Sequence, residues 1–140
     1  MTAVAVAQFA PSADEEDNLA VIRRLTATAA ERGARVVVFP EYASYFVDPF
    51  DASLAEHAQD LDGPFAAALT ALAALHDVHI VAGLVEHAGD RRRVRNTVIA
   101  VSAAGIVARY RKLHLYDAFG QRESDWVEAG RTAEAETFEV

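Results

Sequence analysis

The sequence predicts an α/β fold in a single domain. Short valine-rich runs alternate with two segments whose apolar residues recur at helical spacing, and three further apolar runs follow with only turns between them. The 140 residues include 52% hydrophobic and 24% charged residues, which suits one globular domain and argues against a disordered chain. We therefore expect residues 1–140 to form one domain with the element order β-α-β-α-β-β-β.

The first part of the chain predicts a β-α-β unit. Residues 3–9 are dense in valine and alanine and predict a buried strand. The acidic residues 14–17 supply negative charge where the N-terminus of a helix favours it, and Gly33 is a suitable C-terminal stop. Residues 35–39 predict a second buried strand, ended by Pro40. Such a crossover is right-handed and makes the two strands parallel. The helix between them carries its apolar stripe on Leu19, Ile22, Leu25 and Ala29.

The later part of the chain predicts a second helix and a meander of strands. Residues 42–61 form an aromatic loop with one short helical turn, and Asp62-Gly-Pro64 opens the helix. Regular structure is expected to fade after Lys112, and residues 137–140 resemble the opening of another strand. The buried stripe of the helix is expected at Phe65, Leu69, Leu72 and Leu75, and the strands at 78–85, 94–102 and 106–110.

Charge and composition exclude several classes of partner. A net charge of −8 argues against nucleic acid and against an anionic membrane surface, because both need a positive field. The apolar start is too short for a signal peptide, and no apolar run approaches the ~20 residues of a membrane span. We therefore expect a soluble cytoplasmic protein. The absence of cysteine excludes disulfides and thiolate metal sites within this sequence.

Two segments place a charged residue directly after a strand-like run. Glu41 follows Val36-Val-Val-Phe-Pro40, and Lys112 stands in Tyr110-Arg-Lys-Leu-His-Leu115. Strand ends are where α/β proteins gather their chemistry, so we expect these two side chains to converge in a shared cleft. A third charged residue, Glu123, follows in the motif Phe119-Gly-Gln-Arg-Glu123.

With these three motifs in this order, the sequence resembles the nitrilase superfamily of carbon–nitrogen hydrolases, particularly its amidase-like branches. The resemblance covers nearly the whole chain, and Gly83, Asn96 and Thr97 also fit the family pattern as structural positions. It implies the first half of an α-β-β-α sandwich, with Glu41 as general base, Lys112 stabilising the oxyanion and Glu123 assisting. The family's nucleophilic cysteine lies just beyond the equivalent of residue 140. We therefore expect a carbon–nitrogen hydrolase domain truncated before its nucleophile strand and inactive by itself.

The resemblance further implies a substrate and an assembly. The complete protein is expected to hydrolyse a small linear amide to a carboxylate and ammonia through a cysteine thioester, without cofactor or metal, and to form a dimer or larger homo-oligomer. We expect Phe39, Tyr42 and Tyr45 to wall the Glu41 carboxylate, with Tyr42, Tyr45 and His114 assigned to substrate binding. For His114, a structural hydrogen-bonding role is the alternative. An isolated half of such a sandwich exposes apolar surface and is expected to aggregate or associate.

Other interpretations remain open at this stage. The chain is alternatively a non-catalytic half-domain acting by association, a nitrile-hydrolysing or carbamoyl-hydrolysing member, or an unrelated α/β ligand-binding domain. Glu41 then becomes a turn carboxylate, Lys112 an edge-strand lysine and Glu123 a solvated loop residue. His76 and His79 are three residues apart, but no further ligand completes a metal site. The arginine run is expected to be a solvated hairpin tip; it comprises Arg91, Arg92, Arg93 and Arg95.

Overall fold

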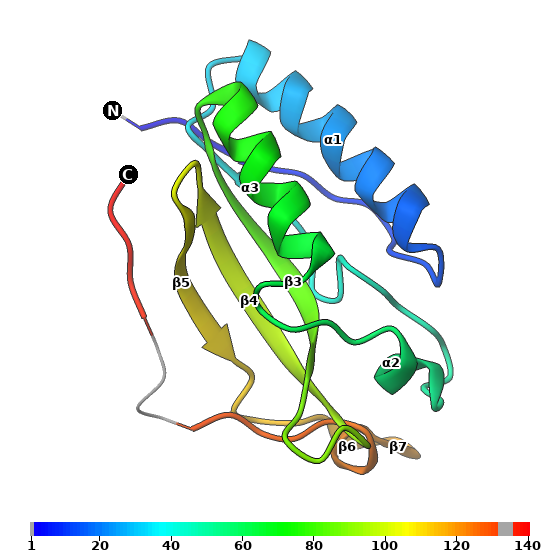
Figure 1. The fold of residues 1–140 in the computed structure, drawn as a ribbon. Helices are drawn as coiled ribbons and strands as arrows, with labels where there is room; N and C mark the ends of the chain where they lie inside the picture. The colour runs from blue at the N-terminus through cyan, green and yellow to red at the C-terminus, as the bar shows by residue number, and fades with distance from the viewer. Residues whose placement is uncertain (1, 132–135) are drawn as a thin grey trace.

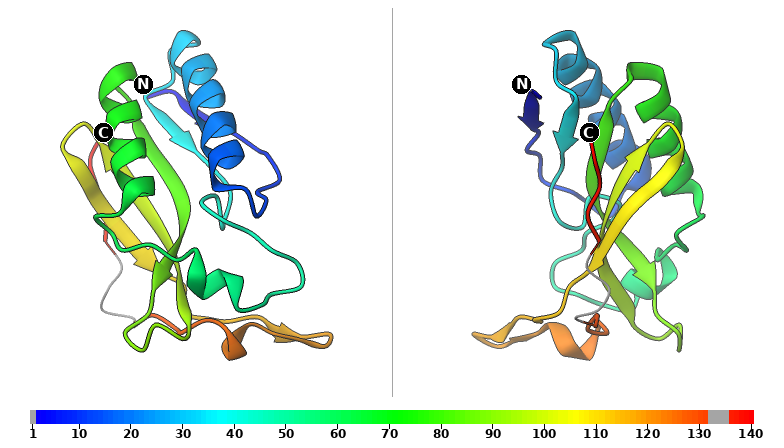
Figure 2. Two further views of the ribbon diagram at one scale, coloured as in Figure 1. Left: turned by 45° about the vertical axis from the view of Figure 1, so that its right-hand side comes forward. Right: turned by 90° about the vertical axis from the view of Figure 1, so that its left-hand side faces the viewer.

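A five-stranded mixed sheet covered on one face by two helices makes up most of the molecule (Figures 1 and 2). The structure, a computed structural model, describes residues 2–131 and 136–140. Within them lie three α-helices, seven strands and one 3₁₀ turn. Their bounds are β1 Val4–Val6, α1 Glu15–Glu31, β2 Val36–Val38, α2 Ser53–Glu56, α3 Pro64–His76, β3 His79–His87, β4 Val94–Ser102, β5 Gly105–Arg111, β6 Asp117–Ala118, β7 Gln121–Arg122 and the 3₁₀ turn Glu123–Asp125.

The strands stand in the sheet in the order of the chain, β1-β2-β3-β4-β5. β1, β2 and β3 are parallel and are connected through α1 and α3, whereas β3, β4 and β5 form an antiparallel meander. This confirms the expected β-α-β-α-β-β-β order. β6 and β7 pair as a separate two-stranded ribbon.

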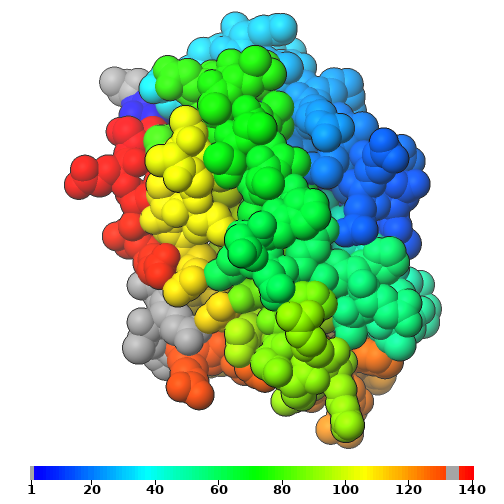
Figure 3. Space-filling model, viewed as in Figure 1, coloured from blue at the N-terminus to red at the C-terminus, as the bar shows by residue number. Residues whose placement is uncertain are grey.

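The main core lies between the helices and the sheet. α1 and α3 pack side by side on this face, which Figure 3 shows in space-filling form. Ile22 of α1, Leu69 of α3, and Ile80 and Ile99 of the sheet are fully buried there. The apolar stripes read from the sequence therefore face the sheet, apart from one residue of α3.

Leu75 was expected in the buried stripe of α3, and this prediction is wrong, because its side chain is 75% exposed. Successive helix residues are rotated by about 100°. The buried arc of α3 is centred on Leu69 and Ala73, and Leu75 lies well outside it. The spacing of the leucines alone therefore predicted too many buried positions on α3. In this turn of the helix the small residue Ala73 is buried, and Leu75 is not.

Residues 137–140 do not open a strand, so this prediction is also wrong. The Glu136 carboxylate, and not a backbone carbonyl, accepts the hydrogen bond from the Arg109 N–H at 3.0 Å. Phe138 stacks on His79 with ring centroids 5.6 Å apart. Side chains thus hold this segment against the sheet in place of a ladder of backbone hydrogen bonds.

The face of the sheet opposite the helices is open at its β1 edge. Val4 is 60% exposed and Val6 is 82% exposed, because these side chains point away from the helical layer. In the described part of the chain, no helix is long and apolar enough to cross a membrane.

The N-terminus of α1 offers a test of local stability. The Asp14 carboxylate accepts hydrogen bonds from the N–H groups of Glu16 and Asp17, each at 3.0 Å. We expect Asp14→Ala to lower the free energy of unfolding by about 1 kcal/mol, because two N–H groups lose their acceptor. Urea unfolding followed by circular dichroism measures the change. Asp14→Asn, which keeps an acceptor oxygen, should lose clearly less, and an equal loss in both variants would contradict a capping role.

Candidate active site

Glu41 lies just after β2, on a loop that runs across β3. The Gly83 N–H donates to the Pro40 carbonyl at 3.2 Å, and the Ser44 N–H donates to the Gly83 carbonyl at 3.1 Å. A side chain at Gly83 would occupy the space of this loop, since a Cβ atom there would lie 2.4 Å from the Tyr42 nitrogen. Tyr42 itself has a left-handed backbone, with φ of 55°. Close contact with β3 and this turn together fix where the Glu41 side chain begins.

Lys112 follows β5 directly and keeps its backbone in register with β4. Its N–H donates to the Asn96 carbonyl at 2.8 Å, and its carbonyl accepts from the Gly130 N–H at 2.9 Å. Asn96 lies in β4, and Gly130 lies in a segment without regular secondary structure. The lysine side chain therefore starts from a backbone that is hydrogen-bonded on both sides.

The side chains of Glu41, Lys112 and Glu123 meet at this end of the sheet. The Lys112 Nζ lies 3.1 Å from Glu41 Oε1, 3.1 Å from Glu123 Oε1 and 3.0 Å from Glu123 Oε2. Glu123 is buried, whereas the Glu41 side chain is 55% exposed and borders open space. The expected convergence of the two strand ends is thus present, and one ammonium group links two carboxylates.

Asn96 and Tyr42 complete the hydrogen bonding of this cluster. The Asn96 amide donates to Glu41 Oε1 at 2.6 Å, and the Tyr42 hydroxyl donates to Glu123 Oε1 at 2.8 Å. The Tyr116 N–H donates to the second oxygen of Glu123 at 2.6 Å. Sequence reasoning placed Asn96 only as a structural position. Its signal was a carboxamide inside a buried strand, which must find a polar partner.

The surroundings shift the ionisation of three of these groups. Burial lowers the pKa of Lys112, but hydrogen bonds from its ammonium to Glu123 and Glu41 outweigh burial and hold this pKa above its usual value. Burial raises the pKa of Glu123, but the Tyr116 N–H, Lys112 and Tyr42 outweigh it and hold the pKa of this carboxyl below its usual range. Burial, followed by the charge of Glu123, raises the pKa of Tyr42 well above its ordinary value. At neutral pH the cluster therefore holds an ammonium, an ionised Glu123 and a neutral tyrosine donor.

The arrangement leaves one carboxylate oxygen for a substrate. Glu41 Oε1 is taken by Asn96 and Lys112, while Oε2 accepts no hydrogen bond from the described residues. The Lys112 ammonium has three N–H donors and lies within 3.1 Å of three carboxylate oxygens, one of Glu41 and two of Glu123. A carboxylate oxygen able to take a proton thus lies beside a cation able to stabilise a developing negative charge.

A cavity of about 640 Å³ opens beside these groups. Its charged lining residues include Glu41, Lys112 and Glu123, and its apolar lining comes from the aromatic loop and from Trp126. Tyr42 lines this cavity, and its role in substrate binding stays a prediction. Glu41 and Lys112 also line a second, smaller hollow of about 290 Å³, whose other lining residues are Phe39, Pro40, Gly83, Asn96, Thr97, Val98 and Tyr110.

Tyr45 and His114 lie elsewhere. Tyr45 is buried behind the loop, where its hydroxyl donates to Ser53 Oγ at 2.7 Å and its ring stacks on His57. His114 is exposed, and neither residue lines the cavity. The expected wall of Phe39, Tyr42 and Tyr45 around the Glu41 carboxylate is therefore incomplete. A loop that turns back on itself, as at the left-handed Tyr42, sends neighbouring aromatic side chains to different sides.

Metal binding finds no support in the described residues, which contain no cluster of three or more histidine, cysteine, aspartate or glutamate side chains able to hold an ion. His76 ends α3 and His79 begins β3, with the left-handed Asp77 between them. The two imidazoles therefore do not share one helical face.

The ionisation of Glu123 gives a stability prediction. Its pKa in the folded protein lies below that of the unfolded chain, near 4.3, so its stabilising effect is complete above that value. As pH falls, the unfolded chain binds the proton first, and the stabilisation is lost until the folded carboxyl is protonated too. We expect the difference in unfolding free energy between the wild type and Glu123→Gln to narrow between about pH 5 and pH 3. Denaturant titrations at several pH values measure it, with the exposed Glu56→Gln as control; a constant difference would contradict the prediction.

Comparison with known proteins agrees with this geometry. The family model for carbon-nitrogen hydrolases matches residues 3–140. The chain is 36% identical over 131 residues to the protein described as Hydrolase Rv0480c of Mycobacterium tuberculosis, covering 91% of this chain and 45% of that protein. It is 37% identical over 134 residues to the deaminated glutathione amidase of Escherichia coli, covering 91% and 48% of the two chains. The chain thus spans about half the length of these curated relatives.

Solved structures share the fold. The Caenorhabditis elegans NitFhit protein superposes with a TM-score of 0.80 at 24% identity, over 94% of this chain and 34% of that one. An amidase from Nesterenkonia sp. AN1 superposes with a TM-score of 0.75 at 21% identity, over 94% and 51%. The chain therefore shares its α/β architecture with these two proteins. The family model covers nearly the whole of this chain, which therefore belongs to the carbon–nitrogen hydrolase family.

Proposed function

We propose that the complete protein hydrolyses a small linear amide to a carboxylate and ammonia through a thioester on a cysteine from outside these 140 residues. The observation that carries this proposal is the Lys112 ammonium held between Glu41 and Glu123 at 3.0–3.1 Å, where all three residues line a cavity. Two similar proteins that are described as amidases also support this proposal. One is the deaminated glutathione amidase, and the other is the Nesterenkonia amidase, whose structure shows acrylamide added at its active-site cysteine.

Each residue has a distinct role in the proposed reaction. Glu41 Oε2 takes the proton of the thiol, and the sulfur attacks the carbonyl carbon to form a tetrahedral oxyanion. Lys112 stabilises that oxyanion with its positive charge and an N–H donor. The C–N bond then breaks, and ammonia leaves with the proton returned from Glu41. Water activated by Glu41 releases the carboxylate and restores the thiol. Glu123 keeps Lys112 in place through two carboxylate oxygens.

The amide enters the cavity lined by Tyr42, and no cofactor or metal takes part. The 140 residues alone are inactive, since they lack the thiol. The complete protein acts in the cytoplasm as a dimer or larger homo-oligomer. Nucleic acid and membrane are not partners, consistent with the net charge of −8.

Carbamoyl compounds and nitriles are second candidates as substrates. The chain is 28% identical over 131 residues to the citrullinase of Francisella tularensis and 32% identical over 120 residues to the nitrilase of Pyrococcus abyssi. The Lys112 motif favours an amide over a nitrile.

A substrate panel with full-length protein tests the proposal. The coding sequence is extended past codon 140, and ammonia release is measured over ω-amides, carbamoyl compounds and nitriles. We expect the largest kcat/KM for a linear amide, complete loss of activity after thiol alkylation, and an acyl-enzyme detectable by intact-protein mass spectrometry. A protein that releases no ammonia from any of them, or whose activity survives alkylation, would refute the thioester mechanism. A stop codon at position 141 would instead favour a half-domain that acts by association.

A further inference from the structure

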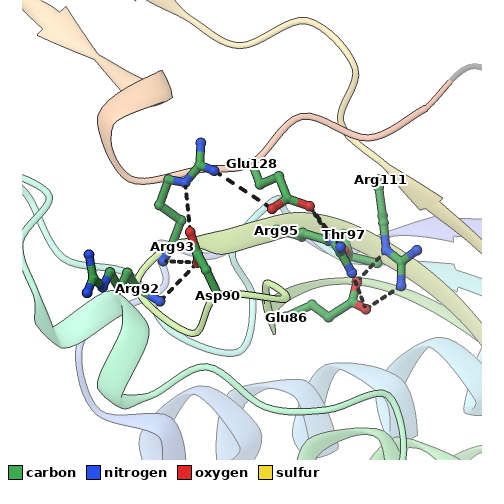
Figure 4. Close-up of polar contacts among 8 residues, drawn as sticks. All are labelled: Glu86, Asp90, Arg92, Arg93, Arg95, Thr97, Arg111 and Glu128. Carbon is green, nitrogen blue, oxygen red and sulfur yellow. Dashed lines mark hydrogen bonds and ion pairs between the residues drawn. The ribbon is translucent and has the colours of Figure 1, made fainter.

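A second buried carboxylate lies on the far side of the sheet from the candidate active site. Glu86 of β3 is 4% exposed. Its Oε2 accepts from Thr97 Oγ1 at 2.6 Å and from Arg111 Nε at 2.8 Å, while Oε1 accepts from Arg111 Nη2 (Figure 4). The Arg111 guanidinium thus binds Glu86 through two parallel N–H groups, the geometry with the greatest directional specificity.

These contacts join three neighbouring strands. Thr97 of β4 stands opposite Arg111 of β5, and Glu86 of β3 stands opposite Arg95 of β4. Side chains alternate between the faces of a strand. The chain neighbours of these residues, Asn96 and Lys112, therefore point to the opposite face, where Asn96 donates to Glu41 and Lys112 binds both carboxylates.

A further arm of the network reaches the segment that carries Glu123. Arg95 binds Glu128 through two nitrogens, at 2.8 and 3.1 Å, and its Nη1 lies 3.9 Å from Glu86 (Figure 4). The Glu128 N–H donates to the Val94 carbonyl at 2.8 Å. This segment is therefore fixed to β4 both by backbone and by side chain, a few residues after Glu123.

The arginine run was expected to be a solvated hairpin tip, which holds for only part of it. Arg91 and Arg92 are exposed. Arg95 is only partly exposed and paired with Glu128 and Glu86, and Arg93 lies 3.9 Å from Glu128 (Figure 4). Strand alternation is the physical reason for Arg95, which falls on the face of β4 that also carries Thr97, whereas Arg93 directly precedes β4.

We propose that Glu86 is a positioning residue for Lys112, acting through its bidentate pair with Arg111 and its contact with Thr97. The inference rests on the proposed function, in which Lys112 binds the oxyanion. A fixed Arg111 side chain holds the end of β5, so that the next residue keeps its place against Asn96. Substitution of Glu86 removes this bidentate partner of Arg111, so we expect the end of β5 to shift against β4 and the contacts of the Lys112 ammonium with its two carboxylates to lengthen.

The ionisation of Glu86 supports its role as a positioning residue. A buried carboxylate costs free energy by desolvation, yet hydrogen bonds from Arg111 and Thr97 outweigh burial and hold the pKa of Glu86 below its usual range. Glu86 is therefore charged at neutral pH. If packing were the only requirement, apolar side chains of similar volume could replace Glu86 and Arg111 without loss of stability. The charged network is better explained by the fixed orientation that it imposes on the Arg111 side chain.

The labelling rate of Lys112 tests this inference without substrate. Lys112 is the only lysine of this sequence, so its reductive methylation by formaldehyde and cyanoborohydride can be followed in a single peptide by mass spectrometry of the full-length protein. A fall of one unit in its pKa raises the reactive neutral fraction about tenfold. We expect Glu86→Gln to raise the labelling rate about tenfold, Thr97→Val to raise it by a smaller factor, and Glu86→Asp to restore part of the protection.

Leu69→Ala serves as the control that is matched for stability, because Leu69 is fully buried in the core, on α3, and is not part of the network. It should leave the labelling rate of Lys112 unchanged under native conditions. In amide hydrolysis, Glu86→Gln should lower kcat on the order of 100-fold with little change in KM, since misplacement by about 1 Å costs this much. Leu69→Ala should leave both parameters unchanged where the protein is folded.

The outcomes distinguish the positioning role of Glu86 from the proposed amide hydrolysis. Equal labelling rates in Glu86→Gln and in Leu69→Ala would refute the positioning role and leave Glu86 with a purely structural one. Faster labelling in Glu86→Gln supports the inference even if the wild type hydrolyses no amide, because labelling needs no substrate. Absence of hydrolysis in the wild type would count against the proposed function alone.

Discussion

Lys112→Ala is expected to lower kcat for amide hydrolysis by the complete protein at least 10²–10³-fold. The substitution removes the proposed donor to the oxyanion and leaves the carboxylates of Glu41 and Glu123 without the cation between them. The loss should therefore appear in kcat.

Steady-state kinetics across pH 5–9 measure this effect. Lys112→Arg keeps the positive charge but not the compact ammonium, so we expect only partial activity in this variant. Arg35→Gln removes a cation from an exposed ion pair with Asp77 and should keep wild-type kinetics. Wild-type kcat in Lys112→Ala would exclude the proposed role of this lysine.

Gly83→Ala is expected to affect both stability and activity. The added Cβ would lie 2.4 Å from the Tyr42 nitrogen and 2.8 and 2.9 Å from the Glu41 carbonyl carbon and Cα. These are backbone atoms, so relief requires the whole loop to move away from β3. Overpacking of this kind costs about 1–3 kcal/mol, and the displaced Glu41 should lower kcat on the order of 10²-fold.

Gly89→Ala provides the matched control for this substitution. No atom outside the neighbouring residues lies within 4 Å of a Cβ at Gly89, and its backbone does not require a glycine. We expect this variant to show wild-type stability and kinetics. If Gly83→Ala behaved in the same way, the close approach of the Glu41 loop to β3 would have no part in positioning the carboxylate.

The sequence predicted the fold well wherever one physical signal dominated. β4 was predicted at residues 94–102 and has those bounds, because an apolar run between two turn signals leaves little freedom. The edge strand β1 is shorter than predicted, at three residues. The predictions of a buried Leu75 and of a strand at residues 137–140 were wrong. Periodicity and β-propensity do not specify which neighbouring residues a side chain or strand can pack against.

The candidate site was partly accessible from sequence. Motif order placed Glu41, Lys112 and Glu123, which the structure brings together. The partners of these residues were harder to foresee. Asn96 and Glu86 are polar residues within apolar strands, and their meaning depends on which residue stands opposite in the register. Sequence gives the alternation along one strand, whereas register between strands comes only from the folded sheet.

The order of strands in the sheet also bears on how this site is assembled during folding. Turns of a few residues connect β3, β4 and β5, whereas β1, β2 and β3 are connected by longer crossovers through α1 and α3. Closing a long loop costs more entropy than closing a short one, so pairing of neighbouring segments is faster. The lysine-bearing half of the site thus belongs to the part of the sheet with local contacts, and Glu41 joins it only when the distant β2 docks.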